Sequence, residues 1–100
     1  MSHPVPLFSI VIPTYNRPDR LASCLQSLTQ LSYPRDRFEV IVVDDGSSPP
    51  IAPEAEPFKS SLNLTLLRQN NSGPACARNT GAAQAQGQYL VFTDDDCQPY

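Results

Sequence analysis

Four short runs of apolar residues divide the chain, and polar residues follow each of them. The runs lie at residues 7–12, 38–43, 62–67 and 89–92. The second run is rich in Val and Ile with almost no polar interruption, which is typical of a parallel strand covered on both faces. The third alternates enough to predict a half-exposed strand at an edge of a sheet. We expect the first and fourth runs to be buried strands as well.

Two stretches between these runs have helical character. In the first, Asn16 is the expected N-cap and Pro18 lies in the first turn, and apolar residues follow at helical spacing: Leu21, Leu25, Leu28 and Leu31. Residues 75–86 are rich in Ala, with Gly87 as the expected C-cap. Residues 46–57 contain four Pro, which predicts a loop without regular structure.

The resulting order is strand, helix, strand, loop, strand, helix, strand, which defines the α/β class with a mostly parallel sheet. Crossovers between parallel strands are right-handed. Right-handed crossovers after the first two strands, followed by a return past the first strand, predict the spatial order 3-2-1-4. Ligands of such sheets bind at the carboxyl ends of the strands, where the order reverses.

Carboxylates gather at two of these strand ends. Asp44 and Asp45 follow the second run, and Asp94, Asp95 and Asp96 follow the fourth. Hard oxygen ligands suit Mg²⁺ or Mn²⁺, and Mg²⁺ takes one or two carboxylates and completes its shell with water and substrate phosphate. The acidic runs therefore indicate a metal that carries a phosphorylated ligand. The competing interpretation of each run is a solvated turn that opens a helix.

Composition limits the partners. The 100 residues carry a net charge of −3, and the seven Lys and Arg are scattered, which argues against nucleic-acid binding. Three Cys without zinc-site spacing favour reduced thiols and a cytoplasmic setting. No apolar stretch approaches the roughly 20 residues that span a bilayer, so we expect no membrane contact from this segment, although a longer parent protein could associate with a membrane.

Four blocks of sequence carry a resemblance to a known family. They are IVIPTYNR at 10–17, EVIVVDDGS at 39–47, Asn71-x-Gly73 with ARNTG at 77–81, and FTDDD at 92–96 followed by Pro99. In order and spacing these blocks resemble the family 2 glycosyltransferases, over nearly the whole chain. The resemblance implies a GT-A fold, with a Rossmann-like three-layer nucleotide-binding half before an acceptor-binding half. It also implies inverting transfer of a sugar from a nucleoside diphosphate donor, expected to be a UDP-sugar.

The resemblance also assigns roles to residues. Pro13, Thr14 and Tyr15 would line the base and ribose pocket, and Asp44 would bind uracil or ribose with Asp45 beside it. Asp94-x-Asp96 would be the DxD motif, with Asp94 and Asp95 near the nucleotide and Asp96, with Asp94, on a Mn²⁺ or Mg²⁺ ion. Arg78 would either reach phosphate, or pair with a nearby carboxylate or cap the sheet edge.

The resemblance further implies which parts lie elsewhere. The catalytic base of the family follows the DxD motif, in the half that binds the acceptor, so we expect no catalytic residue before Tyr100. Residues 1–100 then form a partial domain that is catalytically incomplete when isolated, and its uncovered apolar faces favour self-association. The acceptor is unknown and could be a saccharide, a lipid or a protein.

Three rival classes share parts of the pattern. A haloacid-dehalogenase-type phosphatase needs its Asp-x-Asp near the first strand, followed by Thr or Val, whereas Gln98 stands in that place. A receiver domain needs a late Lys, and none follows Lys59. A non-catalytic nucleotide-binding module stays open, and turnover would separate it from an enzyme. The glycine-rich motifs GxGxxG and GxxxxGK[ST] are absent.

Overall fold

Four parallel strands form one sheet in the order β3-β2-β1-β4. The computed structural model describes residues 6–93. The strands are β1 (Phe8–Thr14), β2 (Phe38–Asp44), β3 (Leu64–Arg68) and β4 (Tyr89–Phe92). The predicted strand order is therefore confirmed, with the reversal between β1 and β4.

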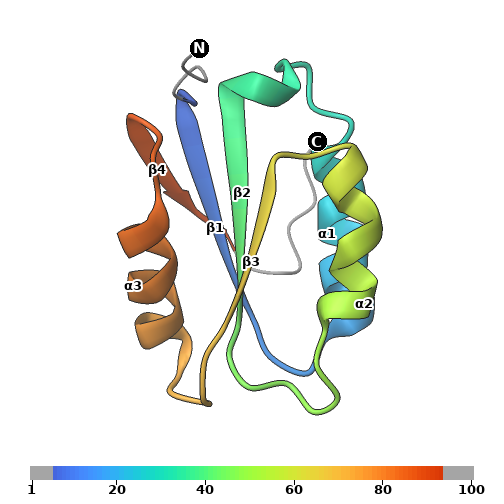
Figure 1. The fold of residues 1–100 in the computed structure, drawn as a ribbon, viewed down its shortest axis with the longest axis vertical. Helices are drawn as coiled ribbons and strands as arrows, with labels where there is room; N and C mark the ends of the chain where they lie inside the picture. The colour runs from blue at the N-terminus through green and yellow to red at the C-terminus, as the bar shows by residue number, and fades with distance from the viewer. Residues whose placement is uncertain (1–5, 94–100) are drawn as a thin grey trace.

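Helices cover both faces of this sheet, which gives three layers (Figure 1). Helix α1 (Pro18–Leu28) and the short helix α2 (Ala52–Ala55) lie on one face, and α3 (Pro74–Gln84) lies on the other. Successive residues of a strand point to opposite faces, so β1 and β2 supply two cores. The larger core lies under α1 and α2, and the smaller one, under α3, consists of Val11, Ile41, Val43 and Ala77.

The burial of the strands follows their places in the sheet. All seven residues of β2 are buried, as its apolar run predicted. The half-exposed β3 lies at an edge, which is also confirmed. The expectation of a buried fourth strand is wrong: in the described residues β4 is the other edge, and its side chains are exposed, from 40% at Val91 to 58% at Tyr89.

Several element ends differ from the sequence predictions. The N-cap of α1 is Arg17 rather than Asn16, and α3 ends at Gln84 with Ala85 rather than Gly87 as its C-cap. Residues 46–57 are not wholly irregular, because they contain α2 and the start of a 3₁₀ helix, Glu56–Ser60. Proline is tolerated in a first helical turn, and burial of Ala55 in the larger core fixes this short helix. A second 3₁₀ helix, Arg35–Arg37, precedes β2.

The predicted apolar face of α1 is confirmed, since Leu21, Cys24, Leu25 and Leu28 are buried. Cys76 is exposed and free, whereas Cys24 is disulfide-bonded. The expectation of reduced thiols is therefore wrong for Cys24. Within residues 6–93, the helices are all too short or too polar to cross a membrane.

A buried polar cluster fastens the turn between α3 and β4 to the amino-terminal end of the sheet. The Ser9 hydroxyl donates to Glu39 Oε2 at 2.5 Å, and the Gln86 N–H donates to the same oxygen at 2.6 Å. The Gly87 N–H donates to Ser9 Oγ at 2.7 Å. A Cβ on Gly87 would lie 2.6 Å from Ser9 Oγ, so this close approach requires glycine.

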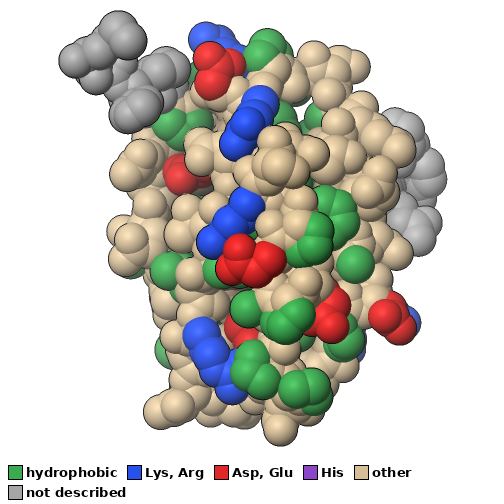
Figure 2. Space-filling view, turned by 45° about the vertical axis from the view of Figure 1, so that its right-hand side comes forward, with side chains coloured by type: hydrophobic (Ala, Val, Ile, Leu, Met, Phe, Trp, Pro, Cys, Tyr) green, Lys and Arg blue, Asp and Glu red, His purple; other side chains and the backbone are tan. Residues whose placement is uncertain are grey.

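Charged side chains on the outer surface are mixed in sign. On the face of the described residues that Figure 2 shows, basic and acidic side chains are interspersed rather than gathered by sign. Two ion pairs are Arg68–Asp44 at 2.6 Å and Lys59–Glu56 at 3.4 Å. The charges on this face therefore do not indicate a binding site, in contrast to the polar groups at the carboxyl edge of the sheet.

Candidate functional site

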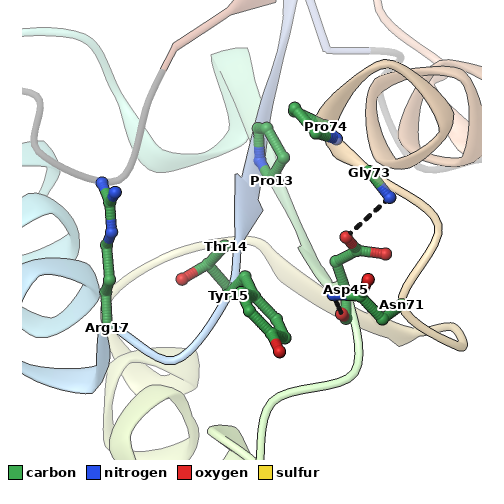
Figure 3. Close-up of a pocket in the computed structure, with 8 residues that line it drawn as sticks. All are labelled: Pro13, Thr14, Tyr15, Arg17, Asp45, Asn71, Gly73 and Pro74. Carbon is green, nitrogen blue, oxygen red and sulfur yellow. Dashed lines mark hydrogen bonds between the residues drawn. The ribbon is translucent and has the colours of Figure 1, made fainter.

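A pocket of about 360 Å³ opens at the carboxyl edge of the sheet. Its walls come from the loops that follow β1, β2 and β3 (Figure 3). The lining residues are Pro13, Thr14, Tyr15, Arg17, Asp45, Asn71, Gly73 and Pro74. The structure thus brings together groups up to 61 residues apart in sequence (74 − 13).

Asp45 joins two of these loops. Its Oδ1 accepts hydrogen bonds from Gln69 Nε2 and from the Ser72 N–H, both at 2.8 Å. Its Oδ2 accepts one from the Gly73 N–H at 3.0 Å, which Figure 3 shows. Burial raises the pKa of Asp45, but the hydrogen bonds from Gln69, Ser72 and Gly73 outweigh burial and hold it below its ordinary value. The carboxylate is therefore charged at neutral pH, and it fixes the loop that leads into α3.

A second layer of hydrogen bonds supports Asp45. The Thr80 hydroxyl donates to Gln69 Oε1 at 2.5 Å, which orients the Gln69 amide so that its nitrogen faces Asp45. Asn71 Nδ2 donates to the main-chain oxygen of Asp45 at 3.2 Å. The sequence analysis assigned no role to Gln69, which directly follows β3, or to Thr80, which lies in the block at 77–81.

Asp44 serves a different loop. Its Oδ1 accepts the Ser47 N–H at 2.9 Å, and its Oδ2 accepts Arg68 Nη1 at 2.6 Å and the Ile51 N–H at 3.3 Å. Asp44 does not line the pocket that holds Asp45, but a smaller one of about 280 Å³ beside Arg68 and Lys59. Its expected contact with uracil or ribose stays a prediction.

The other expected site residues are distributed as follows. Pro13, Thr14, Tyr15 and Asp45 meet at the main pocket, whereas Arg78 is on α3 and does not line it. Asp94, Asp95 and Asp96 lie outside the described residues. The Thr93 N–H donates to the main-chain oxygen of Val11 at 3.1 Å, so the chain is still bonded to the middle of β1 directly before the acidic run.

Four lining residues had no assigned role in the sequence analysis: Arg17, Asn71, Gly73 and Pro74. Arg17, Asn71 and Gly73 fall inside the blocks that carry the family resemblance, which was the available signal. Arg17 supplies a cation to the pocket wall. Residues 6–93 contain no group of three His, Cys, Asp or Glu side chains that could hold a metal ion. The predicted metal ligands, Asp94 and Asp96, are outside that range.

The fold and the pocket define a Rossmann-like α/β protein with a pocket at the carboxyl edge of a parallel sheet, where such sheets bind their ligands. Residues 9–100 match the family described as glycosyl transferase family 2, and the chain belongs to this family. The resemblance seen in the sequence blocks is therefore confirmed, and the phosphatase and receiver-domain alternatives fall away.

Two curated relatives illustrate the similarity. Glycosyltransferase AglE of Haloferax volcanii is 37% identical over 102 residues, which cover 100% of this chain and 34% of AglE. The poly(ribitol-phosphate) beta-N-acetylglucosaminyltransferase TarS of Staphylococcus aureus is 37% identical over 91 residues, which cover 89% of this chain and 16% of TarS. The chain thus spans about a third or less of the length of these relatives.

Solved structures agree with this assignment. TarS 1–349 in complex with UDP-GlcNAc superposes with a TM-score of 0.84 at 37% identity, covering 89% of this chain and 26% of that one. The mannosyltransferase PcManGT of Pyrobaculum calidifontis, in complex with GDP-Man and Mn²⁺, also gives 0.84, at 33% identity, covering 91% and 28%. The expected GT-A type of fold is confirmed by these neighbours.

Proposed function

We propose that this chain supplies the donor site of an inverting, metal-dependent glycosyltransferase that takes its sugar from a UDP-sugar. The observation that carries the proposal is the pocket built from Tyr15 and Asp45, in a chain 37% identical to a protein solved with UDP-GlcNAc. The acceptor is a saccharide, a lipid or a protein.

The base and ribose would occupy the described pocket. Tyr15 is 46% exposed and presents an aromatic ring at the pocket, on which a flat pyrimidine ring can pack. Thr14 and Asn71 offer hydroxyl and amide groups for ribose or base. Asp45, with its carboxylate already bound by three donors, keeps the far wall in place rather than reaching for the ligand.

The diphosphate would lie toward β4. Arg17 lines the pocket and offers a guanidinium, whose fork of donors suits phosphate oxygens. The donor set for a metal also fits, because Asp94 and Asp96 supply hard oxygens directly after Thr93, whose N–H is bonded to Val11 of β1. A bound Mn²⁺ or Mg²⁺ would act as a Lewis acid that stabilises the charge of the departing diphosphate.

Calorimetric titration of the chain with UDP, with and without Mn²⁺, tests this proposal. We expect binding that strengthens with Mn²⁺, and loss of the Mn²⁺ effect in Asp96→Ala. Asp36→Ala is the matched control, because Asp36 is an exposed carboxylate in the 3₁₀ helix before β2. Metal-independent binding that Asp96→Ala leaves unchanged would rule out the DxD assignment, and tighter binding of GDP than of UDP would rule out the uridine donor.

Transfer needs its own assay, because a non-catalytic nucleotide-binding module would also bind UDP. Release of UDP from a panel of UDP-sugars, measured with the longest form of the protein that can be expressed, separates the two. Acceptor-dependent release supports the transferase, and tight binding of UDP-sugars without any release supports the binding module.

A further inference from the structure

Beyond the pocket itself, we propose that Asn16 and Ser47 are positioning residues that act through Tyr15. In this proposal they hold the loop after β1 against the loop after β2, so that the Tyr15 ring is already positioned at the pocket before a nucleotide binds. The proposal rests on the proposed function, since Tyr15 is the residue that would pack on the base.

Two hydrogen bonds join the loops. The Asn16 N–H donates to Ser47 Oγ at 2.8 Å, and the Ser48 N–H donates to Asn16 Oδ1 at 2.9 Å. Ser47 is fully buried, although its neighbour Ser48 is exposed. The Ser47 N–H in turn donates to Asp44 Oδ1 at 2.9 Å. The Asp44 carboxylate at the end of β2 therefore fixes the backbone of Ser47 and, with it, the position of the Ser47 hydroxyl.

The backbone of Asn16 explains why this residue type suits the position. Asn16 has a φ of 54°, in the left-handed region that Asn adopts more readily than most residues. This turn aims both its N–H and its side-chain oxygen at residues 47 and 48. The Asn16 side chain does not cap α1, because the N-cap of that helix is Arg17, which makes no side-chain capping bond.

Tyr15 is fixed from its other side as well. Thr14 is 3% exposed, and its main-chain oxygen accepts the Asp45 N–H at 2.9 Å. The backbone is therefore anchored on both sides of Tyr15 while the ring itself stays 46% exposed. An exposed aromatic ring on an anchored backbone is a preorganised contact, because little main-chain freedom is left to lose when a ligand binds.

The same loop contacts the third wall of the pocket. Gly46 has a φ of 84°, and a Cβ there would lie 2.8 Å from the main-chain nitrogen of Asn71. The turn at residues 46–48 is thus packed between Asn71 on one side and Asn16 on the other. Removing the Ser47 hydroxyl would remove one of the two hydrogen bonds between these loops and would leave the hydrogen bonds of the Asp45 carboxylate intact.

The test is a double-mutant cycle on UDP affinity. Ser47→Ala removes the acceptor for the Asn16 N–H, and Asn16→Gly removes the side-chain oxygen while tolerating the positive φ. Each change should weaken UDP binding roughly three- to tenfold, the equivalent of about one hydrogen bond. In a Tyr15→Ala background the same changes should have little further effect. Ser48→Ala is the matched control and should bind as the wild type does, because the contact of Ser48 with Asn16 uses its backbone N–H.

Hydrogen exchange supplies a readout without ligand. The Asn16 amide should exchange faster in Ser47→Ala than in Ser48→Ala, while the melting temperatures of the two variants stay close. Equal losses of affinity with and without Tyr15, in a wild type that binds UDP, would overturn the positioning role alone. Absence of UDP binding by the wild type would overturn the proposed function and this role together.

Discussion

Asp44 and Asp45 are adjacent at the end of β2, yet their carboxylates hold different loops. Asp44 accepts hydrogen bonds from Arg68 on β3 and from the Ser47 N–H, whereas Asp45 accepts them from the backbone before α3, including the Gly73 N–H. Successive side chains of an extended chain point to opposite faces, so one carboxylate braces the far side of the sheet and its neighbour faces the pocket.

The contribution of the Asp45 carboxylate to the stability of the fold should depend on pH. The folded state holds the pKa of Asp45 below its ordinary value, so its contribution to stability is full above about pH 3.9, the unperturbed pKa of Asp, and is lost as pH falls through the lower folded pKa. Asp45→Asn places an amide NH₂ group next to backbone N–H donors, where it cannot accept a hydrogen bond. The substitution should lower the free energy of unfolding by about 1–3 kcal/mol at pH 7. Urea unfolding at pH 7 and pH 3 checks this. A stability difference between wild type and variant that stays constant at both pH values would contradict it.

Arg68 should matter more for stability than for nucleotide binding. Arg68→Met would leave the buried Asp44 carboxylate with two backbone donors and no cation, at a cost of about 1–3 kcal/mol in the free energy of unfolding. Arg68 does not line the main pocket, but its Nη2 donates to the main-chain oxygen of Ser47 at 3.0 Å, so UDP affinity should fall no further than it does in Ser47→Ala. Unfolding and UDP titration of Arg68→Met, with Arg68→Lys as the charge-retaining control, measure both effects. A selective loss of UDP affinity would instead place Asp44 and its partner at the ligand.

Gly81 should be intolerant of any side chain. A Cβ at this position would overlap a methyl group of Val11 and lie 3.2 Å from Val43 Cγ2, because α3 lies directly against β1 and β2. Gly81→Ala should therefore destabilise the chain by about 1–3 kcal/mol, in spite of the better helix propensity of Ala. Ala83→Ser, on the exposed side of the same helix, is the control and should stay within about 0.5 kcal/mol of wild type. Thermal unfolding of both variants decides the point, and a stabilised Gly81→Ala would show that α3 can move away from the sheet.

The exposed edge at β4 should make the chain associate. Tyr89, Leu90, Val91 and Phe92 are each at least 40% exposed and form an unpaired edge among residues 6–93. Such strands recruit further strands, and a charge on the edge suppresses the pairing. Sedimentation velocity should show concentration-dependent self-association that Val91→Lys reduces, whereas Thr65→Lys, an exposed position on the opposite edge strand, should leave it unchanged. A monomer at all concentrations would contradict this prediction.

Strand identity and order could be read from the sequence because each strand carries a dense apolar run, and right-handed crossovers leave few arrangements. The exposure of β4 could not be read in this way, because a run such as Tyr89–Phe92 looks the same at an edge as in the centre of a sheet. Helix ends were also missed: Asn is a good N-cap, but at Asn16 a bond to the loop after β2 outweighs capping.

The candidate site was predictable in part for a related reason. Tyr15 and Asp45 stand directly at strand ends, where parallel sheets place their chemistry. The support from Gln69 and Thr80 was not predictable, because it depends on how the loop after β3 folds back toward β2. Which of the two adjacent Asp residues faces the pocket depends on strand pleat and register, and neither can be read from the sequence.

The cluster of Glu39, Ser9 and Gly87 secures the sheet at the end remote from the pocket. Changes in the pocket loops therefore need not loosen the attachment of α3 and β4 to the rest of the molecule. A protein built in this way can try new residues around its ligand while its architecture stays intact. Evolution can therefore change the ligand that such a sheet binds by replacing a few residues at its carboxyl edge, because the opposite end is held by separate contacts.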